Sequence, residues 1–577
     1  MAPTASAPSD RDLVSVQEAR TLAARAKSSA SALAELSQDQ IDRLVEAMAA
    51  AARRRAEELA RLAVEETGYG VVADKVEKNL FSSDRVFEFI RPMRTVGVIG
   101  RDPERKVVEI AEPFGVVAAI VPSTNPTSTA IYKILISIKA RCPIVISPHP
   151  AAARCITRVA EVMTEAALAA GLPDGAINWM RTVTLEGTQE LMKHRDVAVI
   201  LATGGMGLVR AAYSAGKPAY GVGPGNAPCF IERTADVPKA VSDILIGKTF
   251  DYGVLCSSPN SVVVEAAIAD DTQREFVRQG AHFLKPADAE ALARILVSPQ
   301  RLPNPKLVGK SAAFISEQAG ISVPAGTRAL IAPLAGVGRD HPLSIEKLCP
   351  VLSYYVVKDW REGCERCIQI LRYGGMGHTM SIHSQNEPVI LEFGLKKPAF
   401  RICVNTPTTH GSIGLTTGLD PAMTLGCGGF GGNITSDNIT PKHLLNIKRL
   451  AYEIRPALRR TDVPGPPAAA APPSPAGGSG RLPQVSVQAD AGLSAQAVSR
   501  QVEAFAEDAR SSEGSAEGSA ADPGPKPVDF VCEEDVRLAI KAGRRITVHD
   551  RTLITPSARD LAAAHKIFVE QSWPRSR

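Results

Sequence analysis

A single cysteine in the stretch FDYGVLCSSPNS, residues 250–261, stands where a side chain could do chemistry. Cys256 follows a glycine turn and precedes the strand-like run SVVVEAA. A thiol presented in this way can act as a nucleophile, since its thiolate attacks carbonyl carbon readily. A lone cysteine is more often a small buried apolar residue. The surrounding motifs must decide between these two interpretations.

Other chemically useful residues stand in glycine-rich or proline-rich turns. Six of them follow predicted strands: Pro122 and Asn125 in VPSTNPTS, Ser147 in SPHP, and Thr203, Gly204 and Gly205 in LATGG. Glu346 lies in IEKLCPVL and His378 in GGMGHT. Taken singly, each is an ordinary turn, surface or structural residue. A glycine fingerprint followed by an acidic residue at ribose-binding distance is missing, so a standard Rossmann site is unsupported.

The elements that must position these residues follow from the sequence pattern. Residues 11–90 are rich in Ala, Leu, Glu and Arg at helical spacing, with Ser37 or Asp39 as a cap, and predict helices. Strands and helices then alternate, which is typical of a doubly wound parallel sheet that binds ligands at its carboxyl edge. The sequence predicts an α/β fold with a cofactor-binding domain over 11–226 and an α/β catalytic domain over 227–425.

The remaining segments differ in composition. We expect residues 426–458 to return to the cofactor domain and residues 1–10 to be disordered. Proline, alanine, glycine and serine dominate 459–490 and 511–527, which we interpret as linkers of a flexible C-terminal extension. They flank a predicted amphipathic helix, 491–510. Residues 528–577 predict a small α/β module that reads strand, helix, strand, helix, to which we assign no chemistry.

Eight motifs, taken in order, resemble the aldehyde dehydrogenase superfamily. They are VPSTNPTS, SPHP, LATGG, GVGPGNAP, FDYGVLCSS, IEKLCPVL, GGMGHT and MTLGCGGFGGN. Their wording is similar to the CoA-acylating branch, which includes propionaldehyde and acetaldehyde dehydrogenases of bacterial microcompartments. The resemblance covers about residues 12–458. It implies the two-domain fold of that superfamily, a nicotinamide cofactor and coenzyme A as acyl acceptor.

The resemblance also implies roles for single residues. Cys256 matches the catalytic thiol, and Asn125 matches the asparagine whose amide helps to bind the oxyanion. His378 could relay a proton from CoA or be structural. The residues implied to contact the cofactor, NAD, are Pro122, Ser147, Thr203, Gly204, Gly205 and Glu346. Since Ser147 stands where hydrolytic members usually have a lysine on the adenosine ribose, NADP stays open as the alternative.

One departure from the family pattern indicates the reaction. Hydrolytic members carry a glutamate general base upstream of the cysteine, and the matching position here is Val222. A valine cannot accept a proton, and general base catalysis contributes roughly 10² to 10⁴-fold. A thiol acceptor needs less help, because its pKa of about 8.5 leaves some thiolate at neutral pH. We therefore expect a short-chain aldehyde to be converted to acyl-CoA through a thioester on Cys256.

Other functions stay open as alternatives. The protein could be a hydrolytic aldehyde dehydrogenase if Glu232 or another carboxylate reaches the site. It could also be a non-enzymatic assembly protein that has kept the fold. Cys427, in CGGFGGN, is the rival nucleophile, although no strand follows it. We expect no bifunctional aldehyde-alcohol dehydrogenase, since the tail after 458 is short for an alcohol dehydrogenase domain.

Composition and the tail bear on partners and location. The net charge of +5 is small for 577 residues and the basic residues are dispersed, so we expect no nucleic acid partner. No apolar run is long enough to span a membrane, and no cysteine spacing predicts a metal site. The helix 491–510 resembles an encapsulation peptide for microcompartment shell or cargo proteins. We expect a cytoplasmic homo-oligomer, with 94–112 as the hairpin through which it assembles. The expected substrate is a short uncharged aldehyde.

Overall fold

The computed structural model describes residues 10–457, 530–531, 533–548, 552–554 and 556–570. The chain divides into two units, residues 1–462 and 463–577, and each is described by itself. The predicted disordered start (except Asp10), both linkers and the predicted helix 491–510 lie outside the described residues.

The first two helices of the amino-terminal segment begin at side-chain caps. Asp10 accepts the N–H of Asp12 at 3.0 Å, and Ser37 forms a capping box with Gln40, so Ser37 rather than Asp39 is the cap. The helices of this segment are α1 (Arg11–Ala34), α2 (Gln38–Arg54), α3 (Ala56–Thr67), α4 (Val72–Leu80), the π-helical η1 (Phe81–Val86) and α5 (Phe87–Ile90).

Five parallel strands form the first sheet, in the order β5-β4-β3-β6-β7. The strands are β3 (Val116–Val121), β4 (Ile144–Pro148), β5 (Ile177–Trp179), β6 (Val197–Thr203) and β7 (Ala219–Val222). The helices between them are α6 (Pro126–Lys139), α7 (Ala153–Ala169), α8 (Leu185–Lys193) and α9 (Met206–Tyr213). The strand order reverses between β3 and β6, and ligands of such sheets bind at the carboxyl ends of these two strands.

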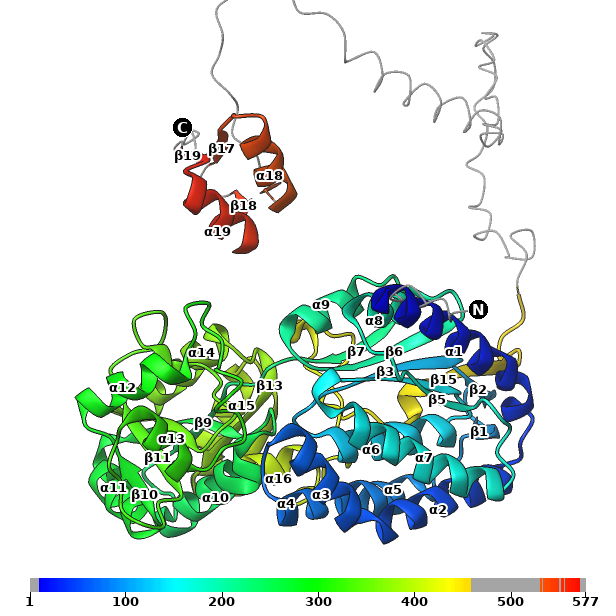
Figure 1. Cartoon of the computed structure of the whole chain (residues 1–577), viewed down its shortest axis with the longest axis horizontal. Helices are drawn as coiled ribbons and strands as arrows, with labels where there is room; N and C mark the ends of the chain where they lie inside the picture. Colours follow the sequence, from blue (N-terminus) through cyan, green and yellow to red (C-terminus); the bar gives the residue numbers. More distant parts are fainter. Residues whose placement is uncertain (1–9, 458–529, 532, 549–551, 555, 571–577) are drawn as a thin grey trace, which may run out of the picture. The chain divides into compact units, whose positions relative to one another are not determined.

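Helices cover both faces of this sheet (Figure 1). On one face the core joins α2, α6 and α7 to the strands, and on the other it joins α1, α8 and α9. The strands β3 and β4 are therefore buried along their whole length. The predicted doubly wound α/β arrangement is confirmed.

Residues 223–226 carry the chain from the first sheet into a second one. Its seven strands are all parallel, in the order β10-β11-β12-β9-β8-β13-β14. They are β8 (Ala227–Ile231), β9 (Pro259–Glu265), β10 (Ala281–Phe283), β11 (Ala329–Pro333), β12 (Val351–Val357), β13 (Gly377–His383) and β14 (Ala399–Val404). The helices around them are α10 (Val237–Thr249), α11 (Ala269–Arg278), α12 (Pro286–Leu296), α13 (Ala312–Ala319), α14 (Trp360–Tyr373), α15 (Glu387–Lys396) and α16 (Thr408–Ser412).

A three-stranded antiparallel sheet lies beside the first domain. The predicted hairpin is present as β1 (Gly97–Asp102) and β2 (Val107–Pro113). The strand β15 (Leu445–Ala451) from the return segment pairs with β2. Leu450 in β15 is about half exposed, and so presents apolar surface on this sheet.

The second unit contains a small module with its own apolar core, which includes Val536 and Ala562. It runs β16 (Phe530–Val531), α18 (Glu533–Lys541), β17 (Ile546–Val548), β18 (Leu553–Ile554), α19 (Pro556–His565) and β19 (Phe568–Glu570). Strand β16 pairs with β18 and β17 with β19, all parallel. The sequence predicts strand, helix, strand, helix for this module, and the structure has two further strands, β18 and β19. Strands of two or three residues are too short to show an alternating pattern in the sequence.

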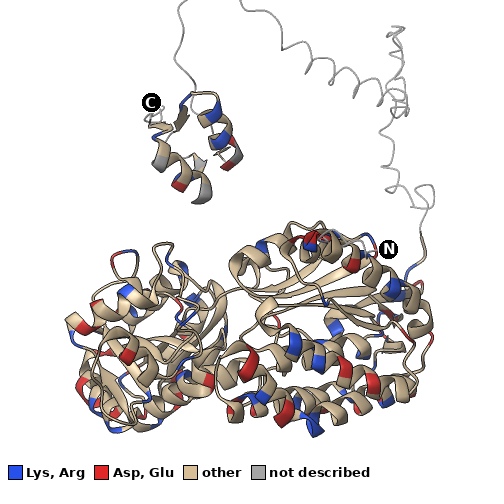
Figure 2. Ribbon diagram, viewed as in Figure 1, with Lys and Arg blue, Asp and Glu red and all other residues tan. Residues whose placement is uncertain are grey.

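Positively and negatively charged residues are mixed over the ribbon in the view of Figure 2. Among the described residues, no helix combines the length and the apolar character needed to cross a membrane.

Candidate active site

A cavity of about 460 Å³ opens at the carboxyl ends of β3 and β6, where the two large sheets meet. Residues of the first sheet form most of its wall, and the loop before β9 and the loop before β12 complete it. The predicted site residues that line the cavity are Pro122, Asn125, Ser147, Thr203, Gly204, Gly205, Cys256 and Glu346. The structure thus brings together side chains that lie up to 224 residues apart, taking Pro122 and Glu346 as the ends (346 − 122).

The loop that carries Cys256 has an unusual backbone. Asp251, Tyr252 and Gly253 are consecutive residues with positive φ, of 50°, 52° and 76°. At Gly253 a Cβ would lie 2.9 Å from the carbonyl oxygen of Lys248, so a side chain has no room. This left-handed turn ends α10 and leads Cys256 into the cavity wall just before β9.

Cys256 as a residue is partly exposed, in contrast to the other described cysteines, which are buried. Burial in the cavity wall raises its pKa to about 12, and the negative charge of Glu346 adds to the rise. The guanidinium of Arg401, in β14, acts in the opposite direction and lowers this pKa. Cys256 is therefore a thiol at neutral pH until a bound molecule or a movement changes these surroundings.

Asn125 is the residue before α6, in the turn that follows β3, and is 8% exposed. Its side chain makes no capping hydrogen bond to the helix. Its Oδ1 accepts a hydrogen bond from Nζ of Lys78 at 2.7 Å. Its Nδ2 donates to Oγ1 of Thr124 at 3.2 Å. Lys78 lies on α4 and was not among the residues predicted from the sequence, because its spacing there is that of an ordinary helix.

Glu346 lies opposite the first sheet and is held by the segment that joins the two sheets. Its Oε1 accepts the N–H of Gly225 at 2.8 Å. Burial raises the pKa of Glu346 to about 8, while the Gly225 N–H and the charges of Lys248 and Lys347 act against that rise. The carboxyl group is therefore largely protonated at neutral pH.

Asn260 ties three loops of the site together and was also missed by the sequence analysis. Its Oδ1 accepts the N–H of Lys347 at 3.0 Å and Nζ of Lys248 at 3.1 Å, while its Nδ2 donates to the carbonyl of Gly225 at 3.2 Å. The loop of Cys256, the loop of Glu346 and the crossing segment are thus fixed to one amide. An asparagine at the start of a strand gives no sequence signal for this role.

The other end of the cavity fits a dinucleotide. Oγ1 of Thr203 is buried and has no hydrogen-bond partner among the described residues, so it is available to a ligand. The helix α9 starts at Gly205 without a side-chain cap, and its free N–H groups suit a pyrophosphate. A Cβ at Gly205 would meet nothing within 4 Å, so this turn is open to a bound molecule.

Ser147 lies at the same end, on β4, and is buried. Its hydroxyl shares a hydrogen bond of 2.8 Å with the hydroxyl of Thr188, which itself donates to the carbonyl of Thr184 at 2.9 Å. Ser147 therefore donates to Thr188, and its oxygen can accept from a ribose hydroxyl. Of the described residues that line the cavity, none is a lysine or arginine.

His378 does not line the cavity, unlike the other predicted residues. It is buried behind Gly225, where a Cβ would lie 3.2 Å from its Cγ. Its Nδ1 is 2.9 Å from Oγ1 of Thr379, and its Nε2 has no partner within the described part of the chain. Burial and the charge of Arg401 lower the pKa of His378 to about 3, so the imidazole is neutral.

The position of the family's general base is occupied by an apolar side chain. Val222 ends β7, is buried and lines the cavity. Glu232, the carboxylate considered as a substitute, does not line the cavity and accepts hydrogen bonds from Thr234 and Ser384 instead. Glu346 is the only carboxylate among the described lining residues.

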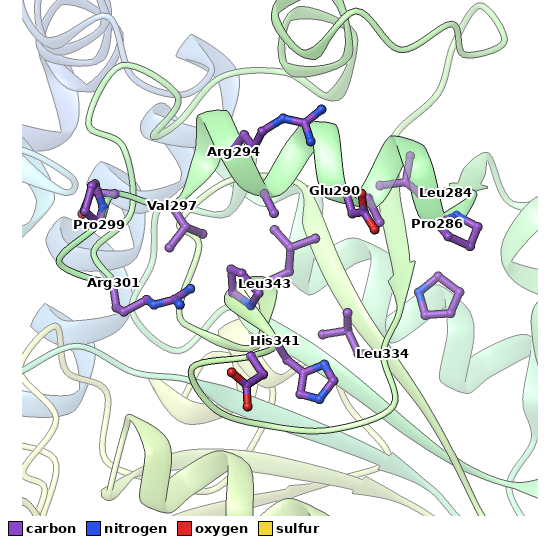
Figure 3. Close-up of a pocket in the computed structure, with 16 residues that line it drawn as sticks. Leu284, Pro286, Glu290, Arg294, Val297, Pro299, Arg301, Leu334, His341 and Leu343 are labelled. Atoms are coloured by element: carbon purple, nitrogen blue, oxygen red, sulfur yellow. The ribbon is translucent and has the colours of Figure 1, made fainter.

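A second cavity of about 730 Å³ lies elsewhere, beside the second large sheet (Figure 3). It is bounded by α12 and by the residues after β11, and its wall includes Arg294, Arg301 and His341. None of the predicted site residues lines it. Across the described ranges, no group of three or more His, Cys, Asp or Glu side chains is arranged to hold a metal ion.

The fold and the site define an α/β protein in which the carboxyl edge of one parallel sheet faces a cysteine in the loop before a strand of a second sheet. The model of the aldehyde dehydrogenase family matches residues 9–292. The succinate-semialdehyde dehydrogenase (acetylating) of Clostridium kluyveri is 38% identical over 439 residues, covering 76% of this chain and 96% of that protein. The bifunctional aldehyde-alcohol dehydrogenase of Escherichia coli is 41% identical over 444 residues, covering 76% of this chain and 50% of that protein.

Solved structures give the same result. An acetylating aldehyde dehydrogenase of Geobacillus thermoglucosidasius is 49% identical with a TM-score of 0.77, over 78% of this chain and all of that one. A propionaldehyde dehydrogenase from the fucose utilisation microcompartment of Clostridium phytofermentans is 28% identical with a TM-score of 0.68. The match covers 76% of this chain and 98% of that one. The propionaldehyde dehydrogenase of Rhodopseudomonas palustris, solved with bound CoA and an acylated cysteine, is 25% identical with a TM-score of 0.68. The match covers 75% of this chain and 97% of that one.

The chain belongs to the aldehyde dehydrogenase family. Two of the relatives named above, those of Clostridium kluyveri and Geobacillus thermoglucosidasius, are described as acetylating enzymes. It spans about half the length of the bifunctional relatives it matches.

Proposed function

We propose that this protein oxidises a short-chain aldehyde to acyl-CoA, with NAD as the oxidant and Cys256 as the nucleophile. The observation that carries the proposal is the cavity that Cys256, Asn125 and the turn at residues 203–205 line together. Val222 lines the same cavity at the position where hydrolytic enzymes have a glutamate base. The names of the acetylating relatives support the same reaction. The acylated cysteine and bound CoA of the Rhodopseudomonas palustris enzyme support a thioester with CoA as acceptor.

The proposed reaction begins at Cys256. Its sulfur bonds to the aldehyde carbon, the carbonyl π-electrons move to oxygen, and the thiol proton leaves to solvent. The Asn125 amide donates to the oxyanion, which is worth most in a site that excludes water. When bound, the nicotinamide supplies the two-electron oxidation of the carbon to a thioester. The CoA thiolate then bonds to the acyl carbon, and the Cys256 thiolate leaves.

The residues for the cofactor have distinct tasks. Thr203, Gly204 and Gly205 would hold the pyrophosphate, Ser147 would accept from the adenosine ribose, and Glu346 would hold the nicotinamide ribose. The second phosphate of NADP would meet no lysine or arginine among the described lining residues, which supports NAD. The same composition supports an uncharged aldehyde, in contrast to the semialdehyde acid named for the Clostridium kluyveri relative.

The steps proposed above do not require His378. A neutral imidazole can accept a proton, but its low pKa and its place behind Gly225 make it a poor base for a bound thiol. A relay from CoA would require His378 to reach the cavity after a movement of the crossing segment 223–226.

The test follows NADH formation from the purified protein with NAD and propionaldehyde, with and without CoA. Strict dependence on CoA, with propionyl-CoA as the product, is the expected result. Equal rates without CoA, with the free acid as product, would replace this proposal by the hydrolytic reaction, and Glu346 would then be the candidate base. A protein with no activity under either condition would favour the assembly role.

We also propose that the enzyme works as a homo-oligomer in the cytoplasm, inside a bacterial microcompartment. The description of the Clostridium phytofermentans relative and the pattern of residues 491–510 support this location. Residues 459–577 fused to a fluorescent protein should form foci when shell proteins are co-expressed. A diffuse signal would contradict it. Light scattering of the wild type and Leu450→Glu tests assembly through the β1-β2-β15 sheet.

A further inference from the structure

Three buried charged side chains lie directly behind Asn125. Lys75 and Lys78 on α4 are 1% and 2% exposed, and Asp251 in the turn before Cys256 is fully buried. Nζ of Lys75 is 2.9 Å from Oδ2 of Asp251, and Nζ of Lys78 also donates to that oxygen. Burying charges costs several kcal/mol per ion unless they are paired and hydrogen-bonded, so a cluster of this kind needs an explanation.

The two lysines differ in one contact. Lys78 donates to Oδ1 of Asn125 at 2.7 Å, whereas Lys75 makes its other contact with the backbone carbonyl of Thr124, at 3.4 Å. Both lysines therefore share the structural task of neutralising Asp251. Only Lys78 touches the side chain that we place at the oxyanion.

The contact with Lys78 decides which way the Asn125 amide faces. An ammonium group has three donors and no acceptor, so only the carbonyl oxygen of the amide can face it. A flipped amide would place its NH₂ group against Nζ, donor against donor. The Asn125 NH₂ group therefore points away from Lys78. One of its N–H bonds is used by Thr124 at 3.2 Å, and the other is left for a ligand in the cavity.

The same cluster also holds the loop of the nucleophile. Asp251 lies five residues before Cys256 and has a φ of 50°. Its Oδ1 accepts the N–H of Val71 at 2.7 Å, and its own N–H donates to Oδ2 of Asp74 at 2.6 Å. Asp251 is therefore fixed to α4 on two sides. The amide that binds the oxyanion and the turn that presents the thiol share Lys78 as a common partner.

We propose that Lys78 is a positioning residue for acyl transfer: it fixes the Asn125 amide with an N–H aimed at the oxyanion and polarises that N–H. The proposal deepens the proposed function and rests on it, since it assumes that Cys256 and Asn125 act on one carbonyl group. The positive ammonium group of Lys78, which donates to Oδ1, draws electron density from the amide nitrogen and makes its N–H a stronger donor. No contact of Lys78 with the substrate is implied.

The test compares Lys78→Met with Lys75→Met. Both substitutions remove one cation from Asp251, so both should lower the melting temperature by a similar amount. Removing an oxyanion donor costs about 10² to 10³-fold, and releasing one from its support should cost about 10 to 100-fold in kcat. We expect this loss of kcat for Lys78→Met, with its KM for aldehyde within about threefold of the wild-type value. For Lys75→Met we expect kcat to fall by less than about threefold.

A double mutant separates positioning from general damage. If Lys78 acts through Asn125, adding Lys78→Met to Asn125→Ala should cause no further loss of kcat. Equal losses in Lys78→Met and Lys75→Met, or a double mutant that multiplies the two single losses, would overturn the proposal. If Lys78→Met does not fold, Lys78→Gln takes its place, since it keeps a donor and removes the charge. Its expected loss is about 3 to 10-fold.

A second substrate makes this result independent of CoA and NAD. In para-nitrophenyl acetate, the sulfur of Cys256 bonds to the acyl carbon, the bond to the phenolate oxygen breaks, and nitrophenolate leaves with the electron pair. The thiol proton goes to solvent. The first turnover should be slowed by Lys78→Met to the same extent as kcat. If the wild type releases nitrophenolate in the first turnover but forms no acyl-CoA, the proposed function is contradicted and the role of Lys78 is not. If Lys78→Met releases nitrophenolate as fast as the wild type in the first turnover, the role of Lys78 is contradicted.

Discussion

A Cβ at Gly225 would lie 2.1 Å from the carbonyl oxygen of Cys256, which is far inside van der Waals contact. The segment that joins the two sheets therefore passes directly over the backbone of the nucleophile. We expect Gly225→Ala to displace one of the two and to lower kcat by about 100-fold, as a shift of about 1 Å at a reacting group does. Steady-state kinetics with a CoA-dependent assay measures it.

Gly374→Ala is the control for that substitution. Gly374 lies next to the same segment, but a Cβ there would be 3.6 Å from Cβ of Asn226, an ordinary contact. Its activity should stay within about twofold of the wild type. Full activity in Gly225→Ala would show that the close approach has no consequence for the reaction.

Replacing Cys256 by alanine should lower acyl-CoA formation by at least about 10³-fold, because no other cysteine among the described residues lines the cavity. The circular dichroism spectrum and the melting temperature should stay close to those of the wild type, since the substitution removes a single atom from a residue that is only partly buried. Cys427→Ala tests the rival nucleophile. Its thiol is buried and lies outside the cavity wall, so this variant should keep its activity.

Val222→Glu should restore part of a hydrolytic reaction. The side chain would enter the cavity wall, where a carboxylate could take a proton from water. We expect CoA-independent formation of free acid to rise by about 10 to 100-fold, within the range of general base catalysis. Val222→Gln has the same size without a base and should show no rise. Equal acid formation by both variants would mean that space rather than basicity limits hydrolysis.

The fold was predictable to a large extent, and the reason lies in particular elements. The strands β3 and β4 are buried on both faces, so they read as apolar runs, and the turns at Asn125 and Thr203 follow them directly. The supporting residues were not predictable. Lys78 lies on a helix like any surface lysine, and Asn260 begins a strand. Their roles arise from contacts between segments far apart in the chain, which no local pattern records.

The alkylation of Cys256 should depend on pH in a way that Glu346 controls. Burial raises the pKa of Cys256, so the rate of reaction with iodoacetamide should rise with pH. Glu346 is neutral below its pKa of about 8 and negative above it, and that negative charge raises the pKa of the thiol. Glu346→Gln should match the wild type below about pH 8 and react faster above it.

Glu265→Gln is the matched control for the pH experiment. Glu265 is buried and its pKa is raised by burial, but it pairs with Arg233 and does not line the cavity. Its alkylation profile should follow that of the wild type at every pH. Parallel profiles for the wild type and Glu346→Gln over the whole range would mean that the carboxylate has no influence on the thiol.

A chain that ends at residue 457 should keep the aldehyde dehydrogenase activity. Every predicted site residue and both large sheets lie within residues 10–457. We expect kcat and KM within about twofold of those of the full chain, measured with the same aldehyde, NAD and CoA. A large loss of activity would mean that residues after 457 contribute to the site.

The short crossing between the sheets has a mechanical consequence. Residues 223–226 join the two large sheets, and Gly225 among them holds Glu346, abuts Cys256 and covers His378. The connection between the sheets and the proposed reaction centre are therefore one piece of chain. Any shift of one sheet against the other that moved this segment would also displace the groups around Cys256, so the spacing of the two sheets and the geometry of the proposed reaction are coupled through these four residues.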